Sequence, residues 1–139
     1  MKIFLYYIGK PRDAQANAMA AEYVKRAARY AGCEMREIKP ERTDPWARHP
    51  AARKIVLDAG GQAMDSPRFT ALVADAEQRS QDLVFVVGGA GGLPPGWRER
   101  AGLALSLSSM TYAHELARVM LAEQIYRALA TLRGHPYAR

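Results

Sequence analysis

Cysteine is almost absent from this sequence, because Cys33 is the single cysteine among 139 residues. One thiol cannot form an intrachain disulfide, and a zinc site built from several thiolates needs more cysteines than this chain has. The sequence therefore excludes a disulfide-stapled scaffold and a cysteine-rich zinc domain. A reducing cytoplasm is the expected setting, with Cys33 packed as a small apolar residue.

Long hydrophobic runs are also absent. The apolar stretch near the amino terminus covers only residues 3–8, which is too short for the central region of a signal peptide. No stretch approaches the roughly 20 apolar residues that a membrane-spanning helix needs. We therefore expect no membrane association and interpret residues 3–8 as a first β-strand.

Acidic residues are the scarcer charge, with 14 Asp and Glu against 20 Lys and Arg. The imbalance is confined to residues 1–54, where 12 basic and 6 acidic side chains leave a charge of +6, whereas residues 55–139 carry 8 of each. A basic face favours a polyanionic partner because clustered cations displace counterions from phosphates. Ordinary solvated surface charge is an equal alternative on composition alone.

With 49% hydrophobic residues, a chain of this length predicts one globular domain that spans residues 1–139. Short apolar runs alternate with stretches of helical periodicity, which is typical of an α/β domain with a mostly parallel sheet. The expected strands cover residues 3–8, 34–39, 54–57, 83–87 and 103–107. The expected helices cover residues 14–30, 66–80 and 113–131, with a further helical turn after Pro95. We expect a loop at residues 40–52, a turn at residues 58–64, and Ser66 as a helix cap.

The last of these helices, residues 113–131, is apolar on more than one side. Leu121, Ile125 and Leu129 share one face, whereas Met120 and Tyr126 extend the apolar surface around the helix. Such a helix must be covered twice. We expect its own sheet to be one cover and the same helix of a second subunit, in a two-fold dimer, to be the other.

A glycine cluster at residues 88–92 follows the apolar run 83–87. It lacks the lysine of a P-loop and the glycine spacing of a dinucleotide fingerprint. Two further expected strands end in comparable loops, and ligands bind at the carboxyl edge of open α/β sheets. The three loops predict one pocket with apolar walls at Leu57, Leu107 and Met110 and with backbone hydrogen-bonding groups, which suits a flat heteroaromatic such as adenine. A tight connection without a ligand is the alternative for the cluster taken alone.

Motifs along almost the whole chain resemble one family, the bacterial methyltransferases of the SPOUT superfamily that modify N3 of a pseudouridine in 23S ribosomal RNA. The most specific motifs are residues 121–128, Leu-Ala-Glu-Gln-x-Tyr-Arg-Ala, and residues 133–137, Arg-Gly-His-Pro-Tyr. The pair Leu57-Asp58, the glycine cluster and the block 114–119 resemble the family as well.

The resemblance implies a SPOUT-type α/β fold in which the C-terminal helix is threaded through a preceding loop as a trefoil knot, an exception to the rule that chains avoid knots. It also implies a homodimer in which the C-terminal tail of one subunit completes the active site of the other. The substrate would be 23S rRNA or the ribosome, and the methyl donor S-adenosylmethionine. The residues that the resemblance assigns to this cofactor are Leu57, Gly88, Leu107, Ser108, Ser109, Met110, Thr111 and Tyr112.

The methyl donor carries its own leaving group, so the protein must mainly align the methyl group with the nucleophilic nitrogen. No metal is expected. N3 of a uracil-like ring must lose a proton, and His135 is the candidate base. Tyr137 is expected to stack on the target base or hydrogen-bond to it, and Arg139 is expected to contact phosphate or the developing anion.

Three departures from the family pattern concern the RNA-facing side. The segment 40–52 is short where family members have a longer segment with a helix, and Ala113 and Ala138 stand where they have proline and histidine. The competing hypotheses are a non-catalytic RNA-binding dimer that has kept the knot and lost turnover, and a flavodoxin-like nucleotide-binding module. The lack of a phosphate loop disfavours the second.

Overall fold

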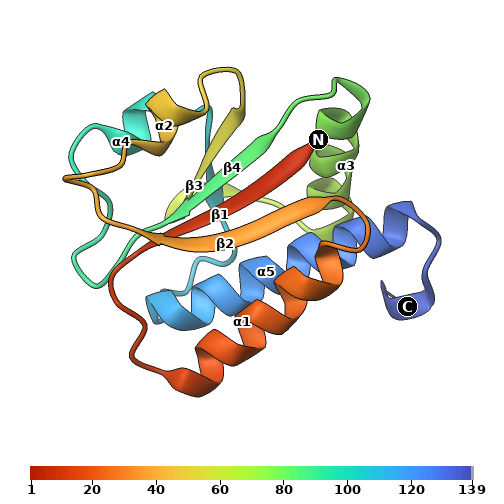
Figure 1. Ribbon diagram of the computed structural model, residues 1–139, viewed down its shortest axis with the longest axis horizontal. Coiled ribbons are helices and arrows are strands. Elements are labelled where there is room, and N and C mark those ends of the chain that lie inside the picture. Colours follow the sequence, from red (N-terminus) through yellow and green to blue (C-terminus); the bar gives the residue numbers. More distant parts are fainter. Residues whose placement is uncertain (139) are drawn as a thin grey trace.

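The computed structural model describes residues 1–138 and shows a five-stranded sheet flanked by helices (Figure 1). The strands lie in the order β2-β1-β4-β3-β5, and every neighbouring pair is parallel. The predicted α/β class with a mostly parallel sheet is confirmed. In chain order the elements are β1 (Lys2–Ile8), α1 (Ala14–Ala27), β2 (Gly32–Ile38), α2 (Pro45–Arg48), β3 (Arg53–Ala63), α3 (Ser66–Gln78), β4 (Leu83–Val87), α4 (Trp97–Arg100), β5 (Leu103–Ser106), α5 (His114–Leu132) and a 3-10 turn, η1 (Pro136–Ala138).

The side chains of the central strands alternate between two hydrophobic clusters, as the pleat of a strand requires. Ile3 and Leu5 of β1 belong to the larger cluster, which also contains residues of α1, α3 and α5. Tyr6 belongs to the second cluster, together with Trp46 of α2 and Trp97 of α4. All five residues of β4 are buried, which explains why its sequence is continuously apolar.

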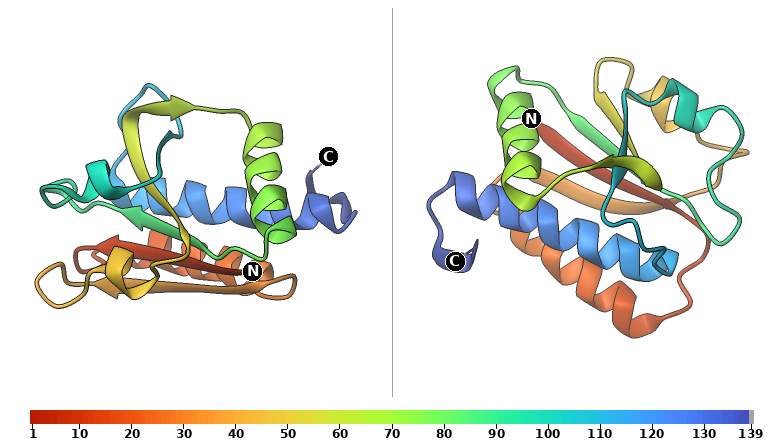
Figure 2. Two further views of the ribbon diagram at one scale, coloured as in Figure 1. Left: turned by 90° about the horizontal axis from the view of Figure 1, so that it is seen from above. Right: turned by 180° about the vertical axis from the view of Figure 1, so that it is seen from behind.

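Helix α5 lies side by side with α1 and also packs on α3 (Figures 1 and 2). Its buried residues lie around most of its circumference between Arg118 and Ala130. Helix α1 thus supplies part of the second cover that the sequence assigned to a partner subunit. Met19 of α1 and Leu116 and Met120 of α5 stay exposed, at 54%, 54% and 38% of their surface.

The expected loop at residues 40–52 is wrong in part, because it contains the short helix α2. Asp44 caps this helix, since its carboxylate accepts hydrogen bonds from the N–H groups of Trp46 and Ala47 at 2.9 and 3.3 Å. The indole N–H of Trp46 donates to the carbonyl of Trp97 at 3.1 Å. The segment is therefore held onto the sheet by a cap and a buried hydrogen bond.

The expected turn at residues 58–64 is also wrong, because β3 continues to Ala63. The strand is irregular between Leu57 and Gln62, and beyond this irregularity Gln62 and Ala63 pair with β5. The cap of α3 is Asp65 and not Ser66, since the carboxylate of Asp65 accepts a hydrogen bond from the N–H of Arg68 at 2.9 Å. Both differences concern residues that directly follow residues 57–59 of β3, which line the site described below.

Cys33 is half-buried against the larger cluster, and burial raises the pKa of its thiol to about 12. Within residues 1–138, no helix is long and apolar enough to cross a membrane. The threading of α5 through a loop stays a prediction from the resemblance.

Candidate functional site

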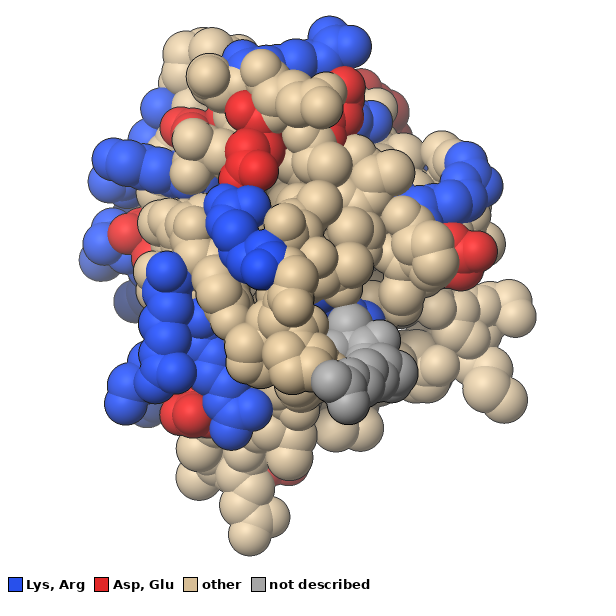
Figure 3. Space-filling view, turned by 90° about the vertical axis from the view of Figure 1, so that its right-hand side faces the viewer, with Lys and Arg blue, Asp and Glu red and all other residues tan. Residues whose placement is uncertain are grey.

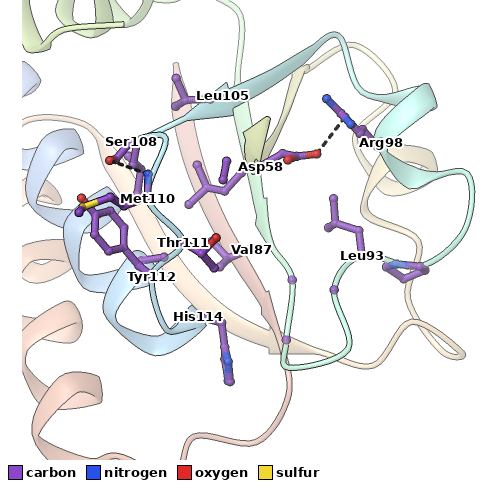
Figure 4. Close-up of a pocket in the computed structure, with 18 of the residues that line it drawn as sticks. Asp58, Val87, Leu93, Arg98, Leu105, Ser108, Met110, Thr111, Tyr112 and His114 are labelled. Carbon is purple, nitrogen blue, oxygen red and sulfur yellow. Dashed lines mark hydrogen bonds and ion pairs between the residues drawn. The ribbon is translucent and has the colours of Figure 1, made fainter. Parts of the chain in front are cut away.

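A cavity of about 490 Å³ lies at the carboxyl edge of the sheet, where three segments far apart in the sequence meet (Figure 4). The first segment is residues 57–59 of β3, and the second is the loop 87–96 that follows β4. The third is the stretch 107–112 that leads from β5 into α5, and His114 and Ala117 of α5 close one side. The structure therefore brings the three predicted loops to one pocket.

The glycine loop gives this cavity a wall of bare backbone. A Cβ atom on Gly88 would lie 2.9 Å from the carbonyl carbon of Gly92, and one on Gly89 would lie 2.7 Å from the carbonyl oxygen of Ile8. Gly92 has a φ of +81°, and its N–H donates to the carbonyl of Gly89 at 2.9 Å. The loop can fold this tightly only because these positions lack side chains.

The cavity is mostly apolar on its walls, and its polar lining includes the side chains of Asp58, Glu99 and His114 besides backbone groups. Leu57, Leu93 and Leu107 contribute apolar surface, and Met110 stands at the mouth with 71% of its surface exposed. Ser108 stabilises the turn at the mouth, because its hydroxyl accepts a hydrogen bond from the N–H of Met110 at 3.0 Å. Such a surface fits an aromatic ring that needs apolar faces and in-plane hydrogen bonds.

Ser106 connects two of the three loops and was missed in the sequence. Its buried hydroxyl lies 3.0 Å from the carbonyl oxygen of Ala59 and 2.9 Å from that of Ser108. The only local sign of this connecting role is a serine at the end of an apolar strand. Its two hydrogen-bond acceptors, the carbonyl groups of Ala59 and Ser108, are brought to it by the fold.

Asp58 lines the cavity but its carboxylate is already engaged. One oxygen accepts a hydrogen bond from the N–H of Gly60 at 2.8 Å, and the other forms an ion pair with Arg98 at 3.0 Å. Arg98 belongs to α4, so this pair connects the β3 segment to the end of the glycine loop (Figure 4). Asp58 is thus a structural contact between two walls.

Seven of the eight residues predicted to bind the cofactor line this cavity, namely Leu57, Gly88, Leu107, Ser108, Met110, Thr111 and Tyr112. Ser109 lies in the same loop but is exposed and outside the lining. Their role in binding stays a prediction. Within residues 1–138, no group of three or more His, Cys, Asp or Glu side chains is placed to hold a metal ion.

The predicted catalytic residues lie elsewhere. His135 and Tyr137 follow the end of α5, whereas the cavity lies at its beginning, beside His114 (Figure 1). A helix of 19 residues is about 28 Å long at 1.5 Å per residue. The tail starts at the far end of this helix and packs back along it as far as Glu123, which does not line the cavity. Arg139 lies outside the described residues.

The tail is anchored on the last turns of α5. The hydroxyl of Tyr137 donates to Glu123 at 2.7 Å, and its ring lies 4.5 Å from the ring of Tyr126. Burial, with this hydrogen bond, raises the pKa of the Tyr137 phenol. The N–H of His135 donates to the carbonyl of Ala130 at 2.9 Å, while the imidazole stays exposed. The anchor therefore presents His135 to solvent.

Arg118 holds the first turn of α5 beside the cavity. Its side chain is 2% exposed, and its guanidinium lies 3.7 Å from the ring centre of Tyr7. It donates to Asn17 at 3.2 Å and lies 3.8 Å from Glu115. Glu115 in turn accepts the N–H of Arg12 at 2.7 Å, and this hydrogen bond lowers the pKa of its carboxyl. This network joins β1, α1 and α5. In the sequence, the only sign of a role for Arg118 is that it belongs to the block 114–119 that resembles the family.

Comparison with known proteins agrees with this geometry. The family model described as "Predicted SPOUT methyltransferase" matches residues 1–138. The chain is 60% identical over 139 residues to the ribosomal RNA large subunit methyltransferase H of Solibacter usitatus, with all of both chains covered. It is 38% identical to the protein of the same name from Gemmatimonas aurantiaca, with 99% of both chains covered. A third such protein, from Allorhizobium ampelinum, is 50% identical over 61% of this chain and 54% of its own. The chain belongs to the SPOUT methyltransferase family.

Proposed function

We propose that this protein transfers a methyl group from S-adenosylmethionine to N3 of a pseudouridine in the 23S rRNA of the large ribosomal subunit. The observation that carries the proposal is the cavity where three strand ends meet, walled by bare glycine backbone and apolar side chains. Full-length relatives that are named ribosomal RNA large subunit methyltransferases support the choice of substrate. Action on ribosomal RNA would place the protein in the cytoplasm.

The cofactor supplies an activated methyl group, and the chain supplies its position. Leu57, Leu107 and Met110 would enclose the adenine ring, while backbone groups near Gly88 and in the stretch 108–112 would bind its polar edge. Burial of the reacting groups excludes water, and alignment of the methyl group with N3 lowers the entropic part of the barrier. Because the donor already carries its leaving group, this chemistry needs no metal ion.

The proton on N3 requires a base. His135 is the proposed base, because its imidazole is exposed beside a rigid anchor. Arg139 is proposed to contact phosphate or the developing anion, and Tyr137 to hold the tail or contact the base. Since the contacts of the tail on α5 are with Glu123, Tyr126 and Ala130, outside its own cavity, it would complete the cavity of a second subunit.

A homodimer of this kind also fits the exposed apolar surface. A second cavity of about 480 Å³ lies between α1, α3 and α5, with Met19, Phe69 and Met120 among its lining residues. Exposed methionines around such a groove are expected where another protein surface packs. A second copy of the chain is the proposed occupant.

Methyl transfer to isolated ribosomal particles tests the proposal. Large subunits from cells that lack this gene are incubated with the protein and labelled S-adenosylmethionine, and the rRNA is digested and analysed by mass spectrometry. We expect one methyl group on a pseudouridine, and we expect His135→Ala to lower the single-turnover rate by about 10²- to 10⁴-fold. No transfer, with no cofactor binding in calorimetry, would favour the non-catalytic RNA-binding dimer instead.

A further inference from the structure

The end of α1 and the C-terminal tail form one continuous surface. The guanidinium of Arg133 donates to the carbonyl oxygen of Tyr30 at 3.3 Å, and the ring of Tyr30 lies 6.4 Å from the imidazole of His135. Tyr30 also lies 6.3 Å from Tyr126, the residue on which the tail is anchored. Any molecule that reaches His135 therefore comes close to the end of α1.

This end of α1 is strongly basic. Lys25 and Arg26 stand in its last turn, and Arg29 follows directly after it. Arg26 is paired with Glu22 at 3.0 Å and lies over the rings of Tyr23 and Tyr126, at 5.7 and 5.9 Å from their centres. Lys25 and Arg29 are exposed, and within residues 1–138 neither has an acidic group within 4.0 Å. Figure 3, which faces the end of the molecule that carries the tail, shows lysine and arginine side chains gathered along one flank.

Two explanations exist for these cations. Basic residues at the end of a helix interact favourably with the helix dipole, but this effect is weak at an exposed surface and fades beyond the last turn. Arg29 lies beyond that turn. Cations without acidic partners, next to tyrosine rings and an exposed imidazole, are the arrangement that contacts the backbone of RNA. The second explanation accounts for Lys25 and Arg29, whereas Arg26 is already paired with Glu22.

We infer that Lys25 and Arg29 bind backbone phosphates of the rRNA strand whose target base is presented to the tail. The inference rests on the proposed function and adds to it the path of the RNA on the protein. The phosphates lie along the end of α1, on the subunit that supplies His135, while the cofactor lies in the cavity of the other subunit. Arg26 supports this surface through its pair with Glu22 and its contact with the tyrosine rings.

The test compares two double variants that each remove two positive charges. The first is Lys25→Gln with Arg29→Gln. The matched control is Arg36→Gln with Lys39→Gln. These side chains are also exposed, have no acidic group within 4.0 Å among residues 1–138, and lie in the second half of β2 and directly after it, outside the segment 40–52 and at the opposite end of the molecule from the tail (Figure 1). Binding of a 23S rRNA fragment is measured from about 0.05 to 0.2 M salt, together with cofactor affinity, melting temperature and methyl transfer.

We expect the first double variant to bind RNA about 10-fold more weakly and to lower the slope of log affinity against log salt by about 1 to 2, since each phosphate contact contributes roughly 0.7–0.9. Its cofactor affinity, its melting temperature and its single-turnover rate at saturating RNA should stay close to those of the wild type. The control should bind RNA within about twofold of the wild type.

Equal losses in both double variants would overturn the inference, because they would indicate a general effect of net charge. Unchanged RNA affinity and salt slope in the first variant would overturn it as well. The single variants Lys25→Gln and Arg29→Gln give the same answer if the double variant proves unstable. RNA binding is read independently of turnover, so failure of methyl transfer in the wild type would contradict the proposed function and leave the binding comparison decisive.

Discussion

His49 occupies an unusual place for a residue in a short connecting segment. Its Nε2 lies 2.8 Å from the hydroxyl of Tyr6, and its ring lies 4.3 Å from the ring of Phe4. These two aromatic residues belong to β1, so His49 fixes the segment after α2 to the sheet. Burial, together with the charge of Arg48, lowers the pKa of His49 from its ordinary value of 6.5.

The lowered pKa predicts a pH-dependent contribution of His49 to stability. As the pH falls, His49 of the unfolded chain takes up its proton first, so its contribution is complete above pH 6.5 and is lost as the pH falls through the lower pKa of the folded state. Between pH 7.5 and 5, we expect the wild type to lose more of its free energy of unfolding than His49→Gln. Urea denaturation at both values measures this difference, and parallel losses would contradict it.

Residues whose side-chain chemistry is conspicuous can be nominated from the sequence, whereas residues whose partners are distant along the chain cannot. His135 and Tyr137 stand out as a basic and aromatic tail. Ser106 and Arg118 do not, because their hydrogen bonds go to residues 59 and 17, far away along the chain. A side chain that connects distant segments has no recognisable pattern among its neighbours in the sequence.

Among the structural elements, the glycine loop after β4 has the most direct connection to the site. At Gly88, an added Cβ would lie 2.9 to 3.2 Å from backbone atoms of Gly92 and Leu93, so the loop itself would have to move. At Gly91, an added Cβ meets nothing within 4 Å. The two positions therefore form a matched pair within one loop.

We predict that Gly88→Ala weakens cofactor binding by at least about tenfold, because displaced backbone can no longer offer its hydrogen-bonding groups at the same positions. Gly91→Ala should change the affinity by less than about twofold. Titration calorimetry with S-adenosylmethionine measures both variants. Similar affinities for Gly88→Ala and the wild type would show that the glycine loop does not contact the cofactor.

The elements differ in how well their sequence predicts them. Strand β4 is predicted almost to the residue, because a strand buried on both faces has a continuous apolar run. The second part of β3 is not, since Gly60 and Gly61 have the composition of a turn. Gly61 is needed there for a different reason: a Cβ at this position would collide with the carbonyl group of Ala104 in β5. Pairing with a strand some 40 residues later cannot be inferred from local composition.

For the whole molecule, the main question is whether the tail of a subunit completes the cavity of the same subunit or that of its partner. The tail packs against α5 at Glu123 and Tyr126, and neither residue lines the cavity of the same subunit. If the site is shared between two subunits, two variants that are each inactive alone should regain methyl transfer when they form mixed dimers. One variant lacks residues 135–139 and keeps its cavity, and the other carries Gly88→Phe, which blocks the cavity, and keeps its tail.

Each of these variants should be inactive alone. After unfolding and refolding as an equal mixture, we expect about a quarter of the wild-type methyl transfer, because half of the dimers are mixed and each has one intact site. Mixing the truncated variant with a chain that carries both changes should restore nothing. If the first mixture also stays inactive although mixed dimers form, then the tail and cavity do not act across the interface.

The fold class, the approximate position of most strands and helices, the family and seven residues that line the cavity can all be predicted from the amino-acid sequence. These follow from hydrophobic periodicity, from glycine placement and from motifs, all of which are local. Four features become apparent only in the folded protein: α1 covers part of α5, β3 continues past its glycines, Arg118 and Ser106 connect distant segments, and the tail packs back on α5 at Glu123. Those features depend on which segments meet in space, and contacts between distant parts of a chain leave little trace in the residues on either side.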